Sequence, residues 1–261
     1  MSTDDQAGNL RGDTSDVPQR IGMLATQVID VLRDRQGVTG QGIRPFVLDH
    51  LSRAILARGA FDAAALLDQL RGHRLTLDAV IDLYVPAAAT RLGQDWIDDG
   101  LSFADVTIGA MRLQALLGEA FEREQTDPFH CEPLLQAMIV VPQGEQHFLG
   151  ASVLAAQLRR MGCHVSMSFD EEIGVLHTRL LTEAPQLVLI SCGSDETVES
   201  VAQTVQGVKS SLPPASSLVI GGAGVRDNKK LRERTGVDLV TNQAGDAVAL
   251  AVSRVVAVPG S

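Results

Sequence analysis

The stretch Gly144-Glu145-Gln146-His147-Phe148-Leu149-Gly150 indicates how the second half of the chain folds. It follows the short apolar run 138–141, which is typical of a buried strand, and precedes an apolar pattern of helical period. A strand, a polar loop and a helix in this order form part of a parallel α/β unit. On local context alone His147 has two interpretations, a solvated loop histidine or a ligand.

The same alternation continues to the end of the chain and predicts a five-stranded parallel Rossmann-like domain over residues 135–257. Helices on both faces of the sheet are expected to connect its strands. The strands are expected at 135–141, 163–168, 186–191, 216–220 and 237–240, and the helices at 147–160, 171–184, 195–210, 226–235 and 243–256.

The first half of the chain is helical in pattern. Residues 1–17 are polar and predict a disordered tail, residues 18–125 an N-terminal helical bundle, and residues 126–134, with two prolines, a linker. Pro86 lies inside one helical run and predicts a kink. The expected helices span 19–36, 43–58, 60–71, 76–98 and 102–124. The predicted fold class is therefore α + α/β, a bundle followed by a parallel sheet.

Composition narrows the classes of function. The 261 residues carry a net charge of −10, a poor match for phosphate backbones, so direct nucleic-acid binding is not expected. Neither a signal sequence nor an apolar run of membrane-spanning length is present, which predicts a cytoplasmic protein without a membrane partner. The three cysteines show no pairing or metal spacing. The sequence shows neither a catalytic triad nor a Walker loop, so a self-contained enzyme is not expected.

Two further motifs follow predicted strands. Ser191-Cys192-Gly193 ends the apolar run 187–190, and Gly221-Gly222 ends the run 218–220. Carboxyl ends of parallel strands meet at one edge of a sheet, where open α/β sheets bind ligands. The alternative is that these residues bind no ligand, since any such sheet carries serine and glycine in its loops.

The three motifs and their spacing resemble the signature of cobalamin-binding Rossmann-like domains. The resemblance implies that His147 ligates the cobalt from below and that Glu145 holds its other imidazole nitrogen. It also implies that Gly150 lets the nucleotide tail of the cofactor pass close to the backbone. Glu145 is itself a departure, since the family usually has aspartate there.

The remaining two motifs are assigned to the dimethylbenzimidazole tail by the same resemblance. Ser191 would hydrogen-bond near the tail, and Gly221 and Gly222 would leave room for it to enter the core. Gly193 stands where the family usually has leucine. The sequence therefore predicts a tail pocket formed by Ser191, Gly193, Gly221 and Gly222.

The bundle carries a second signature, Trp-x-x-Asp-x-x-Ser-Phe-Ala-x-Val-Thr-x-Gly-x-x-Arg-Leu-Gln, over residues 96–114. This wording resembles the AerR/PpaA-type antirepressors of purple photosynthetic bacteria, which are related to haem-binding sensor domains. The resemblance implies that the bundle caps the upper corrin face, with Trp96, Phe103 and Thr107 toward the cofactor. A lone tryptophan at a helix end is otherwise a packing residue.

Such proteins bind a CrtJ/PpsR-type repressor of photosynthesis genes, so the resemblance implies a light-responsive transcriptional regulator that uses cobalamin in a hydroxo, aquo or alkyl form. Light-sensing repressors with a related cap carry Glu-His where this chain has Val106-Thr107. We therefore expect water, hydroxide or another histidine on the light-state cobalt, such as His50 or His73 if the bundle brings one near. The alternatives are a corrinoid methyl-shuttle protein and a haem-binding sensor on the same scaffold.

Overall fold

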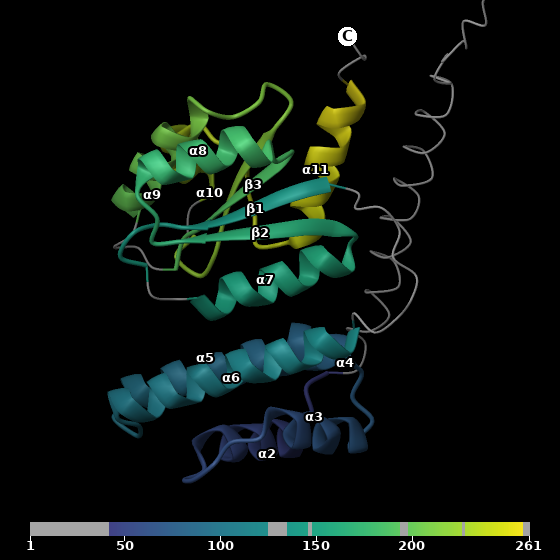
Figure 1. Ribbon diagram of the computed structural model, residues 1–261. Coiled ribbons are helices and arrows are strands. Elements are labelled where there is room, and N and C mark those ends of the chain that lie inside the picture. The colour runs from purple at the N-terminus through teal and green to yellow at the C-terminus, as the bar shows by residue number, and fades with distance from the viewer. Residues whose placement is uncertain (1–41, 125–134, 146–147, 194–197, 226–227, 258–261) are drawn as a thin grey trace, which may run out of the picture.

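The computed structural model describes residues 42–124, 135–145, 148–193, 198–225 and 228–257. The predictions for the tail 1–17, the helix 19–36 and the linker 126–134 lie outside these residues. Within them, the expected class is confirmed: a helical bundle precedes a five-stranded parallel sheet (Figure 1). No helix among the described residues is long and apolar enough to cross a membrane.

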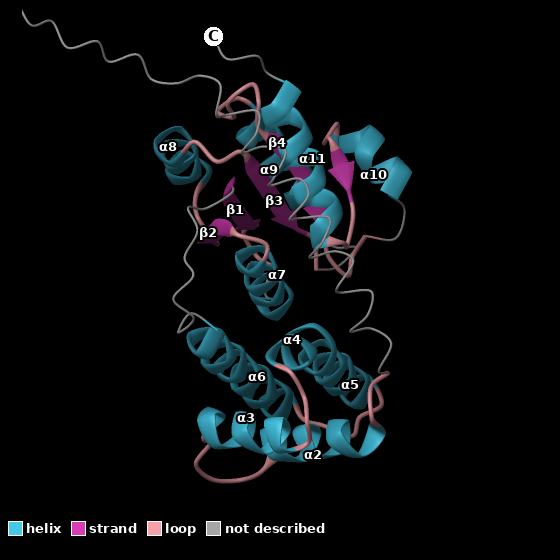
Figure 2. Ribbon diagram, turned by 90° about the vertical axis from the view of Figure 1, so that its right-hand side faces the viewer, coloured by secondary structure: helices cyan, strands magenta, loops and turns pink. Residues whose placement is uncertain are grey.

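The bundle has two layers. Helices α2 (Pro45–Leu56) and α3 (Ala63–Gly72) form the outer layer, and α5 (Val85–Ile97) and α6 (Phe103–Glu124) lie between that layer and the α/β domain (Figures 1 and 2). Apolar side chains at three- and four-residue spacing meet in one core, as the periodicity predicts. Its largest fully buried members include Leu51, Ile55, Leu67, Leu70, Ile81, Tyr84, Leu113 and Leu116.

The predicted disturbance at Pro86 takes the form of a π-helix. Helix α4 (Leu77–Ala79) passes into η1 (Val80–Tyr84), and α5 follows directly. Proline has no N–H to donate to the carbonyl four residues earlier, so a regular helix cannot continue through it. The N–H of Val85 instead donates to the Val80 carbonyl, five residues back, and the backbone widens over one turn.

The sheet has the order β2-β1-β3-β4-β5, with every neighbouring pair parallel. Its strands are β1 (Leu135–Val141), β2 (Cys163–Phe169), β3 (Leu187–Ser191), β4 (Ser217–Gly221) and β5 (Leu239–Val240). The last is shorter than predicted. At Asp238, the carboxylate accepts the Leu218 N–H at 2.8 Å, so a side chain takes a donor that a longer ladder would use.

Helices cover both faces of the sheet, as predicted. Helices α7 (Phe148–Arg160) and α11 (Ala244–Ala257) pack on one face, and α8 (Ile173–Glu183), α9 (Val198–Lys209) and α10 (Asn228–Thr235) on the other. Alternate residues of each strand point to opposite faces. Ile139 therefore joins the α7 and α11 core, whereas Met138 and Val140 join the second core.

Helix α7 connects the two parts of the molecule. Ala151, Ala155 and Leu158 pack on the sheet, whereas Ala156 belongs to the core of the bundle. Figure 2 shows α7 lying between the sheet and the pair α5 and α6.

At the last turn of α7, a partly buried ion-pair cluster fixes it to the bundle. Arg160, whose side chain is 9% exposed, contacts Asp78 at 2.6 Å and Asp82 at 2.5 Å. Gln157 donates to the same Asp82 carboxylate at 3.0 Å. The bundle is thus anchored at the end where α7 finishes, opposite the end where α7 begins.

Candidate functional site

The candidate site lies at the carboxyl edge of the sheet. The strand order reverses between β1 and β3, so the loops that follow these two strands diverge at this point. Ligands of open α/β sheets bind in the crevice at such a switch point. The loop after β1 carries the predicted motif, and the structure describes its residues 142–145 and 148–150. His147 lies outside the described residues.

Glu145 joins the two loops. Its side chain is buried, with 3% exposed, and its Oε2 accepts the backbone N–H of Gly193 at 2.7 Å. A hydrogen bond from an N–H to a carboxylate is among the stronger kinds, and it lowers the cost of burying the charge. Glu145 thus contacts the loop after β3 in addition to any contact with His147, and only the tertiary structure shows this role.

Three of the predicted glycines have close neighbours in the chain itself, a side chain at Gly193 and backbone at Gly221 and Gly222. A Cβ at Gly193 would lie 2.5 Å from the Glu145 carboxylate, and one at Gly221 would lie 2.5 Å from the Thr241 carbonyl oxygen. Real Cβ contacts are essentially never shorter than 3.0 Å. The structure therefore gives these glycines a reason that does not involve a ligand, and their assignment to a tail pocket stays a prediction.

Gly222 is the most constrained position. Its φ is +131°, and a Cβ would collide with the Cys192 carbonyl oxygen and lie 2.8 Å from its carbon. Backbone bonds hold the two loops at this distance, since Cys192 N–H donates to Gly221 at 2.8 Å and Gly224 N–H donates to Cys192 at 2.9 Å. Ser191, the last residue of β3, pairs in register with Gly221 and is half-buried.

Gly150 differs from the other glycines. It lies exposed in the first turn of α7, and among the described residues an added Cβ there would meet no atom within 4 Å. Glycine in a helix costs about 0.5–1 kcal/mol relative to alanine. The fold itself gives no reason for glycine at this position, whereas a ligand that passes close to the backbone would give one.

The bundle presents exposed aromatic side chains on the side of the same edge. Trp96 is 50% exposed and Phe103 is 70% exposed, although both are large and apolar. Thr107 is also exposed, and its hydroxyl donates to the Phe103 carbonyl at 2.8 Å. In Figure 1 the α5–α6 turn extends past the start of α7, on the side where the loops after the strands lie.

The helical period shows which way this part of α6 faces. Phe103 and Thr107 are eleven and seven residues before Gln114, three and two turns respectively, so all three share one stripe of the helix. Gln114 lines a pocket with residues of the α/β domain. The stripe therefore continues for roughly 16 Å from Gln114 to Phe103, at 1.5 Å per residue, over the carboxyl edge of the sheet.

The pocket itself was not predicted. It has a volume of about 450 Å³ and is lined by Gln114 of α6, Phe148 and Ser152 of α7, and Phe169 of β2. Phe148 and Phe169 pack edge to face with ring centroids 5.4 Å apart. Two signals could have pointed to these residues: Gln114 ends the bundle motif, and Phe169 directly follows the strand predicted at 163–168, at the ligand-binding edge.

Two histidines that were considered as alternative cobalt ligands lie elsewhere. His50 is on α2 and His73 caps α3, with their ring centroids 5.8 Å apart. Both belong to the outer layer of the bundle, and α5 and α6 separate that layer from α7 (Figures 1 and 2). In this arrangement neither helix lies next to the site, so the condition for His50 or His73 to serve as a ligand is not met. Among the described residues no group of three or more metal-ligating side chains is present.

A helical bundle followed by a parallel 2-1-3-4-5 sheet is a fold that the chain shares with a known corrinoid protein. The monomethylamine corrinoid protein of Methanosarcina barkeri superposes with a TM-score of 0.63 over 79% of this chain and 95% of its own, at 14% identity. A cobalamin-binding protein from Desulfitobacterium hafniense DCB-2 aligns over 80% of this chain at 17% identity, with a TM-score of 0.40. No family model matches the chain.

The sequence relationship is closer. A Rhodobacter capsulatus protein described as an uncharacterized 20.5 kDa protein in the bchF-crtJ intergenic region is 35% identical over 177 residues. The alignment covers 68% of this chain and 92% of that protein. The chain belongs to the family of this Rhodobacter capsulatus protein.

Proposed function

We propose that the protein binds cobalamin between the bundle and the carboxyl edge of the sheet, where His147 would hold the cobalt, and that the state of the cofactor controls binding to a CrtJ/PpsR-type repressor. When bound, cobalamin supplies a cobalt–ligand bond that light can break. The residues of the chain then orient the cofactor, shelter its upper face and transmit its state to a partner surface.

The described residues fit such a cofactor. The loop with the predicted ligand starts at the β1–β3 switch point, and its buried Glu145 ties it to Gly193. Gly150 has open space around it. Exposed Trp96 and Phe103 give the bundle an apolar surface on the side of the same loop, and exposed apolar clusters of this kind mark binding sites.

The relationship to the Rhodobacter capsulatus protein carries the regulatory part of the proposal. The name of that relative locates its gene between bchF and crtJ, and a CrtJ-type repressor is the partner that the antirepressor resemblance implies. The corrinoid fold alone fits a methyl-shuttle protein equally well, so the genomic location favours the regulator.

Cofactor binding is tested by titrating the apo-protein with hydroxocobalamin and, separately, with haemin while recording absorption spectra. We expect His147→Ala to abolish tight cobalamin binding and the associated spectral change, because the cobalt ligand is lost. His164→Ala is the matched control, since His164 is exposed on β2 and bonds Gln136 at 2.9 Å. An unchanged spectrum in His147→Ala contradicts the assignment, and tight haemin binding without cobalamin binding favours the haem alternative.

Regulation is tested by measuring the affinity of a CrtJ/PpsR-type repressor for the apo, dark and light-exposed forms. A ligand shifts an equilibrium only when it interacts differently with the two states. We therefore expect one cofactor state to bind the repressor better than the apo-protein, and Trp96→Ala to narrow the difference. Equal affinity for all three forms contradicts the sensor and leaves the corrinoid shuttle.

A further inference from the structure

The turn that follows β2, residues 169–171, contacts the cofactor loop on both sides of its Glu-x-His motif. We propose that this turn, held in place by Arg179, is a support that helps to fix the position of the cofactor loop, together with the bond from Gly193 to Glu145. Phe169 and Asp170 are then positioning residues for the cobalt ligand. The inference rests on the proposed function for its consequence in cobalamin binding, but not for the contacts themselves.

Two contacts join the turn to the loop. The Asp170 carboxylate accepts the backbone N–H of Gly144 at 3.2 Å, on the N-terminal side of the motif. The Phe169 ring packs edge to face on Phe148 at 5.4 Å, on its C-terminal side. Because Gly144 and Phe148 flank Glu145 and the two residues after it, a shift of the turn moves both ends of the motif.

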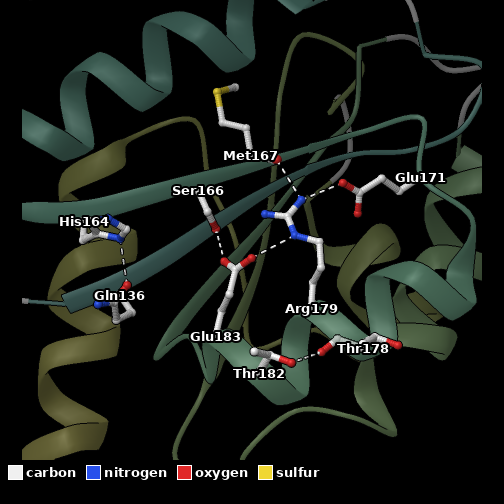
Figure 3. A network of polar contacts seen from close by, with 9 residues as sticks. All are labelled: Gln136, His164, Ser166, Met167, Glu171, Thr178, Arg179, Thr182 and Glu183. Atoms are coloured by element: carbon white, nitrogen blue, oxygen red, sulfur yellow. Dashed lines mark hydrogen bonds and ion pairs between the residues drawn. The ribbon is translucent and has the colours of Figure 1, made fainter.

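Arg179 holds the turn from α8, as Figure 3 shows. Its Nη1 donates to the Met167 carbonyl at 2.9 Å and to the Glu171 carboxylate at 2.6 Å. Arg179 therefore bonds the chain on both sides of Phe169. Its Nε donates to Glu183 at 2.8 Å within the same helix. A guanidinium has a rigid planar fork that satisfies several acceptors at once, which makes this clamp specific to arginine.

Glu183 completes the clamp. It accepts the Ser166 hydroxyl at 2.5 Å as well as Arg179. Burial by itself would raise the pKa of Glu183, but the hydrogen bonds from Ser166 and Arg179 lower it. The carboxylate therefore stays ionised and keeps Arg179 oriented toward the turn.

The backbone conformation explains why the turn carries aspartate. Asp170 has a φ of +51°, a left-handed conformation that aspartate, asparagine and glycine tolerate better than other residues. Asp170 therefore meets two requirements, the conformation and the acceptor for Gly144. Asparagine satisfies both, whereas glycine satisfies only the conformation, and this difference separates the two in an experiment.

The contacts are tested on the apo-protein by hydrogen–deuterium exchange of the peptide that covers residues 142–148. We expect Asp170→Gly to accelerate exchange there by about 3–10-fold, because a native hydrogen bond that restrains the loop is lost. Asp170→Asn should stay within about twofold of wild type. Asp62→Gly is the matched control, since Asp62 caps α3 in the bundle by accepting the Ala65 N–H at 2.9 Å.

Arg179→Lys provides a second test of the clamp, since it keeps the charge and removes the fork. We expect exchange in residues 142–148 to rise in this variant too, with circular dichroism and the urea midpoint showing that the domain is folded. Wild-type exchange in both Asp170→Gly and Arg179→Lys overturns the proposal, and so does an equal rise in Asp62→Gly.

The consequence for the cofactor is measured by titrating the same variants with hydroxocobalamin. Asp170→Gly should weaken cobalamin binding by about 10-fold or more, which is the range found when groups around a metal ligand are removed. It should also alter the absorption spectrum. Asp170→Asn should keep an affinity and a spectrum close to those of the wild type. Unchanged affinity and spectrum despite faster exchange overturn the positioning role. If exchange responds as expected but even the wild type does not bind cobalamin, the support stands and the proposed function fails.

Discussion

Replacing Gly222 by alanine should destabilise the α/β domain in the absence of any cofactor. The residue has a φ of +131°, and its new Cβ would collide with the Cys192 carbonyl. Strained backbone of this kind costs about 1–3 kcal/mol, and overpacking against a rigid neighbour typically costs a further 1–3 kcal/mol. The expected loss in the free energy of unfolding is therefore roughly 2–6 kcal/mol.

Urea denaturation followed by circular dichroism measures this loss. With a dependence of about 1–3 kcal/mol per molar urea, a loss of ~3 kcal/mol lowers the midpoint by roughly 1–3 M. Gly118→Ala is the matched control, because Gly118 lies exposed in α6 and an added Cβ meets nothing within 4 Å. That variant should gain about 0.5–1 kcal/mol. A wild-type midpoint for Gly222→Ala would refute the close approach of the two loops.

The result also bears on the predicted tail pocket. Since substitution of Gly221 or Gly222 disturbs the loops without a ligand, loss of cobalamin binding in such variants does not by itself locate the tail. The wild-type protein offers a cleaner comparison between cobalamin and a corrinoid that lacks the nucleotide tail. Weaker binding of the tailless corrinoid supports a tail pocket, whereas equal binding contradicts it.

Three further predictions concern groups away from the cofactor loop. Burial raises the pKa of Cys163 to about 12, so Cys163 should resist iodoacetamide at about pH 8, measured by the mass of the peptide that carries it, and rapid labelling of Cys163 in the native protein would contradict this. Arg160→Met removes the cation that pairs with Asp78 and Asp82 and should lower the free energy of unfolding, measured in urea, by about 2–3 kcal/mol. A loss below ~0.5 kcal/mol would show that these ion pairs do not anchor α7 to the bundle. Glu183 has a lowered pKa, so its stabilisation is present above its ordinary value of 4.5 and is lost on acidification below it. Glu183→Gln should therefore flatten the fall in stability between about pH 5 and 3, and an unchanged slope would show that this carboxylate is not responsible.

Local patterns in the sequence predicted the elements of the fold. The apolar run before Glu145 and the helical pattern after it gave β1 and α7 to within a residue. Ser102 and Asp105, three residues apart, exchange the hydrogen bonds of a capping box at the start of α6. Such features depend on residues only a few positions apart, so the local composition and the period of the apolar residues are enough to predict them. The position of the site at the carboxyl edge followed from the parallel order of the strands.

Other features depend on segments that the sequence separates widely, and only the tertiary structure decided them. The Glu145 carboxylate meets the N–H of Gly193 across 48 residues, and Asp170 meets Gly144 across 26. No local pattern encodes these distances, because they are set by strand order and by the packing of helices on the sheet. The placement of His50 and His73 in the outer layer has the same origin. Residue types determined which chemistry is possible, and the packing decided which groups meet.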